Sequence, residues 1–233
     1  MLGGLWVMGR HRLLAFAIYA ILAIPTASTA SLVLLSNSEG VRPTILSRQD
    51  WHAKPPRDGM QPQTIRGVIL HHTGELKNRS ISLVAKMQNL QAFSQTAGHV
   101  SLGHSKPAWP DVPYHFYVDA LGRIAEGRDV NYAGDTNTHY DTSGYIQVVV
   151  EGDFEKEQPD PPQLEAVQQL LVWIVLSRNL PTESITVHKN HASTDCPGRN
   201  FVVILPRLLS EISEIRSKIA ADSAVRLEKN FKR

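Results

Sequence analysis

The sequence of 233 residues has a single cysteine, Cys196, so it has no pair that could form an intramolecular disulfide. Its stability must come from a hydrophobic core, which a chain of this length is long enough to build. Aromatic residues make up only 7%, and the 15 glycines and 14 prolines are scattered, which excludes a collagen-like or low-complexity chain. The length fits one medium-sized domain with additional segments.

An excess of charge of either sign is also missing. The chain has 24 basic and 22 acidic side chains, and residues 1–30 hold two of the basic ones, Arg10 and Arg12, but no acid. Beyond residue 30 the chain is therefore balanced, with 22 side chains of each sign. A neutral chain offers no electrostatic attraction for a phosphate backbone, so we expect no nucleic-acid partner.

Long hydrophobic runs are absent except at the N-terminus, which excludes a multi-span membrane protein. There, basic residues 10–12 precede an apolar stretch, 13–25, and small residues, 28–30, that suit cleavage. The pattern predicts a signal peptide over residues 1–30. An uncleaved anchor over residues 13–35 is the alternative, and only then would the membrane be a partner. Both interpretations predict an exported protein, periplasmic or extracellular.

Hydrophobic periodicity predicts strands that alternate with helices, and this favours an α/β fold with a single mixed central sheet flanked by helices. The remaining segments are interpreted as a linker, a domain and a charged C-terminal tail, at 31–43, 44–218 and 219–233. We expect strands at 64–70, 114–118, 123–126, 145–150 and 184–188, helices at 80–93, 161–176 and 201–218, and a loop at 97–113.

Two of the expected strands lead into histidines, His71 and His188, and Cys196 follows His188 by eight residues. Two imidazoles and a thiolate are zinc ligands, and three protein ligands leave a fourth position for water, as in catalytic zinc sites. Pro197-Gly198 favours a turn that would fix the direction of the thiolate. His191 is a rival ligand, but His188 is favoured by its position at the end of a strand. Zinc would also shield a lone thiol outside the cytoplasm.

Five longer stretches occur in an order that is typical of one family, and they cover about residues 44–208. They are SRQDWHAKPP, VILHHTGE, VPYHFYVDALGRIAEGR, YIQVVVEGDF and VHKNHASTDCPGRNF. Together they resemble the zinc-dependent N-acetylmuramoyl-L-alanine amidases, which are related to peptidoglycan recognition proteins and to phage amidase-type lysozymes. The resemblance implies the fold of that family.

The resemblance also implies roles for particular residues. His71, His188 and Cys196 would bind one zinc ion per chain, Tyr114 would act on the reacting water or the developing oxyanion, and Thr194 would be its polar partner. The implied reaction is hydrolysis of the amide between the lactyl group of N-acetylmuramic acid and L-alanine, in peptidoglycan or its fragments. We expect the protein to act as a monomer.

The sequence departs from the family in the expected strand at 145–150. One branch has an acid–base glutamate on the central strand, and the alignment places Val149 there. Glu151 lies two residues further on, on the same face of an extended strand. The sequence therefore predicts the branch that uses Tyr114 and Thr194. The segment before Tyr114 is also longer than in the family, and the additional residues would reshape the substrate groove.

Two other functions remain open. One is a recognition module that binds peptidoglycan fragments without cutting them, but such relatives usually lack the cysteine, and Cys196, Tyr114 and Thr194 are all present. The other is a cysteine peptidase with Cys196 as nucleophile and His188 as base. Against it, Pro197 removes a backbone N–H that an oxyanion hole often uses.

Several further side chains have structural interpretations. His72 and His115 are expected to pack or hydrogen-bond. Trp51 and Trp109 are expected to pack in the core or within a loop, and stacking on a sugar or peptide is the alternative for both. Arg128 is left open between a substrate carboxylate and an ion pair.

Overall fold

The structure is a computed structural model that describes residues 39–99 and 105–231. The predicted signal peptide and most of the predicted linker lie outside these residues. Among the described helices, none is long and apolar enough to cross a bilayer. The last part of the predicted linker contacts the domain, because Val41, in the 3-10 helix η1 (Glu39–Val41), packs against the core and Arg42 stacks over Trp173.

A six-stranded mixed sheet forms the centre, in the order β1-β6-β5-β7-β2-β8. All neighbours are parallel except the β5–β6 hairpin. A separate two-stranded hairpin forms within the expected loop. The strands are β1 (Ile45–Leu46), β2 (Gly67–His72), β3 (Gly98–His99), β4 (Ser105–Lys106), β5 (Phe116–Val118), β6 (Ile124–Glu126), β7 (Tyr145–Val150) and β8 (Ile185–Val187).

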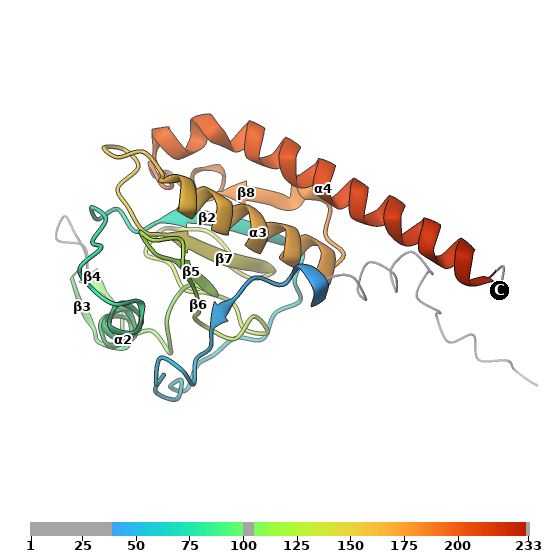
Figure 1. Ribbon diagram of the computed structural model, residues 1–233. Coiled ribbons are helices and arrows are strands. Elements are labelled where there is room, and N and C mark those ends of the chain that lie inside the picture. Colours follow the sequence, from blue (N-terminus) through green and yellow to red (C-terminus); the bar gives the residue numbers. More distant parts are fainter. Residues whose placement is uncertain (1–38, 100–104, 232–233) are drawn as a thin grey trace, which may run out of the picture.

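Helices cover both faces of the sheet (Figure 1). α3 (Pro161–Ser177) and α4 (Arg199–Phe231) lie on one face, and α2 (Leu83–Ser94) lies on the other. The larger apolar cluster joins α3 and α4 to the sheet, and a smaller one joins α2 to it. The predicted class, a single mixed sheet flanked by helices, is confirmed.

The ends of four expected strands differ in the structure: β5 begins at Phe116 rather than 114, β6 at Ile124 rather than 123, β8 covers Ile185–Val187 rather than 184–188, and β2 differs most. β2 pairs with β7 over six residues, with His71 opposite Val149 and His72 opposite Val150. The strand therefore begins three residues later than expected and contains both histidines. Pairing with neighbours, which hydrophobic periodicity does not report, sets these ends.

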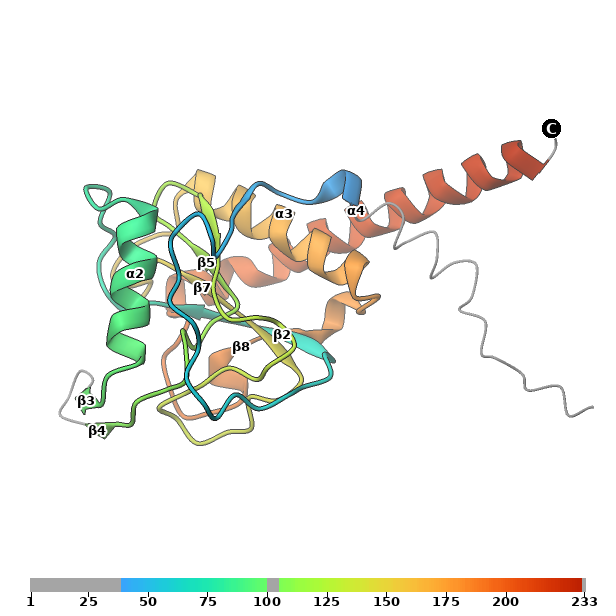
Figure 2. The same ribbon diagram turned by 90° about the horizontal axis from the view of Figure 1, so that it is seen from below.

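The helices agree more closely with the sequence. α3 begins after Asp160, whose amide donates to Gln163 Oε1 at 3.2 Å in a capping arrangement. α4 continues through Phe231 without a break, so it includes most of the residues predicted as a tail. Its C-terminal end projects away from the rest of the fold (Figure 2).

Candidate active site

The two histidines predicted as ligands lie side by side because their strands are parallel neighbours. β2 and β8 pair with Leu70 opposite Val187, so the next residues, His71 and His188, lie at the same edge of the sheet. Their ring centroids are 4.6 Å apart. The carboxyl edge of parallel strands is where α/β sheets usually bind ligands.

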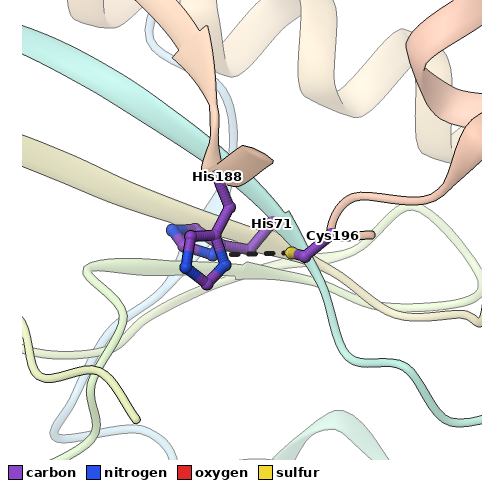
Figure 3. A group of neighbouring side chains, drawn as sticks. All are labelled: His71, His188 and Cys196. Atoms are coloured by element: carbon purple, nitrogen blue, oxygen red, sulfur yellow. Dashed lines mark hydrogen bonds between the residues drawn. The ribbon is translucent and has the colours of Figure 1, made fainter. Parts of the chain in front are cut away.

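Cys196 completes the group from the loop that precedes α4 (Figure 3). His71 Nδ1 lies 3.7 Å from Cys196 Sγ, and one donor atom from each of His71, His188 and Cys196 lies within 4.8 Å of the others. Within residues 39–99 and 105–231, no other three His, Cys, Asp or Glu side chains form such a group. The structure thus brings together the three residues that the sequence predicts as ligands.

Backbone amides of its own loop and of β2 hold Cys196 in place. The Lys189 amide donates to the Cys196 carbonyl at 2.9 Å, and the His72 amide donates to Sγ at 3.4 Å. Gly198 has a φ of +92°, and a Cβ there would lie 2.4 Å from the carbonyl carbon of Phe154. Only glycine fits this position, so the predicted turn after Cys196 fixes the direction of the thiol.

Burial sets the protonation of all three side chains. It lowers the pKa of His71 to about 3, with a further contribution from neighbouring His188, and it lowers the pKa of His188 to about 4. Both imidazoles are therefore neutral at pH 7 and have a lone pair for a metal. Burial also raises the pKa of the Cys196 thiol to about 12, so binding of a cation must release its proton.

The donor set fits zinc, since two imidazole nitrogens and one thiolate are ligands of catalytic zinc sites. Each ring is also held through its far nitrogen. His71 Nε2 lies 2.5 Å from Gln147 Oε1, and His188 Nε2 lies 2.7 Å from Thr138 Oγ1. Nδ1 of each ring is thus left for the metal. Sequence reasoning missed Gln147 and Thr138, because neither belongs to a local pattern that indicates a ligand partner.

A cavity of about 220 Å³ opens onto this group and is also lined by the two predicted catalytic residues, Tyr114 and Thr194. The ring centroids of Tyr114 and His71 are 5.3 Å apart. Burial raises the pKa of the Tyr114 phenol, which keeps it protonated and able to donate a hydrogen bond. Thr194 Oγ1 accepts from the Cys196 amide at 3.2 Å, so its own O–H stays available as a donor.

A larger cavity of about 560 Å³ adjoins the first and shares five lining residues with it. Phe93 and His99 line the part that is not shared, so the extended segment before Tyr114 borders this cavity. Residues 100–104 of that segment lie outside the described part of the chain. Together the cavities leave room for a substrate longer than one sugar or amino acid. The shared residues are Thr73, Trp109, Pro113, Tyr114 and Asn137.

Comparison with known proteins agrees with this arrangement. Residues 61–199 match the sequence model of the family described as N-acetylmuramoyl-L-alanine amidase. The chain belongs to this family. Peptidoglycan-recognition protein SD of Drosophila melanogaster is 28% identical over 169 residues, which are 69% of this chain and 83% of the relative.

Solved structures of the same kind superpose on the chain. One is a chain of the ectodomain complex of peptidoglycan recognition proteins LCa and LCx bound to tracheal cytotoxin. Its TM-score is 0.57 and it is 28% identical, and the match covers 70% of this chain and 95% of that chain. Another is the N-acetylmuramoyl-L-alanine amidase LysC from Clostridium intestinale, with a TM-score of 0.57 and coverage of 73% and 98%. At 20% identity, LysC shows a shared fold alone.

The position that carries a glutamate in one branch of the family is apolar here. Val149 has no exposed surface and packs in the cluster beneath α2. The carboxylate of Glu151 accepts hydrogen bonds from Lys86 Nζ at 2.6 Å and from the amides of Asn78 and Ala120, both at 2.8 Å. Neither Val149 nor Glu151 lines the cavity that holds Tyr114.

The other histidines have separate partners. His191 bonds through Nε2 to the Thr186 hydroxyl at 2.8 Å and is not part of the three-residue group. His72 accepts through Nδ1 from the Phe154 amide at 3.2 Å, and His115 is fully buried with both ring nitrogens hydrogen-bonded. The predictions of structural roles for His72 and His115 are confirmed.

Arg128 and Trp51 are also held inside the fold. Arg128 is 2% exposed, its Nε donates to the Val112 carbonyl at 2.8 Å, and it forms an ion pair with Asp135. Of the two interpretations of Arg128, the geometry favours the ion pair. Trp51 has no exposed surface and donates through Nε1 to the Glu126 carbonyl at 2.7 Å, as expected of a core residue.

Proposed function

We propose that the protein is a zinc-dependent N-acetylmuramoyl-L-alanine amidase. It would hydrolyse the amide between the lactyl group of N-acetylmuramic acid and L-alanine, in peptidoglycan or its fragments. The observation that carries the proposal is the grouping of His71, His188 and Cys196 on one cavity with Tyr114 and Thr194. The catalytic domain would be residues 44–218, acting as an exported monomer.

Zinc, when bound, acts as a Lewis acid and lowers the pKa of water to about 7, which supplies a nucleophile at neutral pH. His71 and His188 bind as neutral imidazoles, and Cys196 gives up its proton. Tyr114 keeps its proton and donates to the carbonyl oxygen as the amide carbon becomes tetrahedral. One such donor contributes about 2.7–4 kcal/mol to transition-state stabilisation. Thr194 orients the reacting groups through its free O–H.

The adjoining cavity supports a peptide-bearing substrate. The lactyl amide would lie at the three-residue group, and the stem peptide would extend over Tyr114 into the cavity that Phe93 and Trp109 line. The names of the relatives support the same class of ligand, since one is a peptidoglycan-recognition protein and another is an amidase.

Binding without cleavage is the second candidate, and the relative named peptidoglycan-recognition protein SD favours it. The complete donor set, with Tyr114 and Thr194 on the same cavity, favours the enzyme. A cysteine peptidase has less support. Its nucleophile would be a buried thiol whose pKa is raised to about 12, and the ring that contacts Sγ belongs to His71 rather than to His188.

Digestion of purified sacculi by the purified protein separates the three candidates. We expect glycan strands free of stem peptides and peptides with a new L-alanine amino terminus, as measured by mass spectrometry. A chelator should abolish these products and added zinc should restore them. Binding to sacculi with no such product would leave a recognition module. Activity that survives chelation but not thiol alkylation would show a cysteine peptidase.

A further inference from the structure

Gln147 contacts the candidate ligand His71 from the middle of β7. Its Oε1 lies 2.5 Å from His71 Nε2, and the Tyr140 hydroxyl lies 3.4 Å from the same oxygen. An amide oxygen can only accept, so the proton of the His71 ring must be on Nε2. Nδ1, which faces Cys196 Sγ at 3.7 Å, then carries the lone pair that a metal needs.

A neutral His71 ring has one proton, which could also lie on Nδ1 instead of Nε2. With no acceptor at Nε2, the ring would be free to place its proton on Nδ1, where the Cys196 sulfur is a weak acceptor. That tautomer blocks the nitrogen that faces Cys196. A hydrogen-bond acceptor next to Nε2 disfavours the Nδ1–H tautomer.

The surroundings of Gln147 show what this contact costs the fold. The side chain is 1% exposed, and its Nε2 has no hydrogen-bond partner among the residues that the structure describes, although a buried amide N–H normally has one. The fold also leaves space for it, because a Cβ on Gly134 would lie 2.9 Å from Gln147 Cγ. An apolar side chain of the same length would remove the unpaired amide but would leave the His71 ring and the Tyr140 hydroxyl without the oxygen that they share. The acceptor oxygen is therefore what the glutamine contributes at this position.

We propose that Gln147 is a positioning residue that holds His71 as the Nε2–H tautomer and so keeps Nδ1 ready for zinc. This rests on the zinc site of the proposed function, but not on what the enzyme cleaves. The Gln147 amide accepts the hydrogen bond from His71 without adding charge to the site. The more common partner of a metal-bound histidine, a carboxylate, adds a negative charge.

The test measures zinc affinity of the metal-free protein by competition with a chromophoric chelator. Gln147→Met should weaken zinc binding about 10–100-fold, as loss of a hydrogen-bond partner of a metal ligand usually does. Gln147→Glu restores an acceptor and should bring the affinity back to within about threefold of wild type or better. Metal-free Gln147→Met and Gln163→Met should both unfold at lower temperature than wild type, because each removes one partner of a buried hydrogen bond. A loss of zinc affinity confined to Gln147→Met is then not a general effect of lowered stability.

Gln163 provides a matched control. It is another fully buried glutamine, whose Nε2 donates to the Glu151 carbonyl at 2.7 Å, away from the three-residue group. Gln163→Met should lower stability and leave zinc affinity unchanged. The inference would be overturned if Gln147→Met bound zinc like wild type, if Gln163→Met weakened zinc equally, or if Gln147→Glu failed to restore the affinity.

The tautomer can be read directly from long-range ¹⁵N–¹H correlation spectra of the metal-free protein. His71 should be the Nε2–H form in wild type and should shift toward Nδ1–H in Gln147→Met. A wild-type ring in the Nδ1–H form would contradict the inference. If wild type binds zinc but cleaves no peptidoglycan, the proposed function fails and this inference stands. If wild type binds no zinc, both fail.

Discussion

One family branch uses a glutamate as acid–base, at the position of Val149 here. Substitution of Glu151 tests whether this residue, two positions further on, has the same role. We predict that Glu151→Gln destabilises the fold and leaves turnover per folded, zinc-loaded molecule unchanged. Lys86 and Glu151 are 9% and 4% exposed, and their charged atoms are 2.6 Å apart. The substitution leaves Lys86 as a buried cation with no anion beside it.

The expected magnitude follows from that burial. Removing one partner of a buried ion pair costs about 3–5 kcal/mol in the free energy of unfolding. The amides of Asn78 and Ala120 also donate to this carboxylate, and a neutral glutamine has one oxygen fewer to accept them. For a domain of this size, the melting temperature should fall by roughly 6–20 °C, at about 2–4 °C per kcal/mol.

Urea unfolding of wild type, Glu151→Gln, Lys86→Met and the double variant measures the effect. The double variant should be less destabilised than the sum of the two single variants, because no unpaired charge remains. Turnover is measured well below the melting temperature at matched zinc content. A Glu151→Gln variant that keeps wild-type stability but loses turnover would refute the reasoning and make Glu151 a catalytic acid or base.

Four further outcomes are expected. Wild type should contain one zinc per chain by elemental analysis and Cys196→Ser much less; equal zinc in both would remove Cys196 from the ligand set. Tyr114→Phe should fold and keep its zinc but lose turnover by roughly a hundredfold or more, since it removes one oxyanion donor; unchanged turnover would leave Tyr114 a structural role. Burial lowers the pKa of His115 to about 4, from the 6.5 of an exposed imidazole. As the pH falls from 6.5 toward 4, this histidine therefore becomes protonated in the unfolded chain but not in the folded protein. Between pH 7 and pH 5, metal-free wild type should therefore lose roughly 2 kcal/mol more stability than His115→Asn, and parallel pH profiles would contradict this. The mature protein should begin near Ser31 by N-terminal sequencing; an intact Met1 on protein from the membrane fraction would instead show an anchor, with residues 10–12 on the cytoplasmic side.

The sequence predicts the parts of this fold that have a local cause. The apolar run Tyr145–Val150 predicts β7 with both ends correct, and the helix expected at 161–176 begins where α3 begins and ends one residue before it. β2 begins three residues and ends two residues later than expected, because its ends depend on pairing with β7 and β8. Periodicity within one segment carries no information about a partner strand.

The same distinction separates the site residues. The three candidate ligands lie at a strand end or beside a turn with a sequence signal, and the structure brings them together. Gln147 is an ordinary polar residue on a buried strand, and Thr138 lies in a loop, so only their contacts with the imidazoles reveal them. The ion pair of Glu151 likewise could not be predicted locally, because its partner, Lys86, is 65 residues away in the chain.

The order of the strands has a consequence for how the chain folds during synthesis. β2, near the start of the domain, lies between β7 and β8, which follow it in the chain by more than 70 residues. A growing chain therefore has no partner for either edge of β2 until most of the domain has been made. Pairing of this non-local kind folds slowly, and the unpaired strand is exposed to aggregation in the meantime. Truncation before Ile185 would remove β8 and leave one edge of β2 open permanently, and an open strand edge favours aggregation.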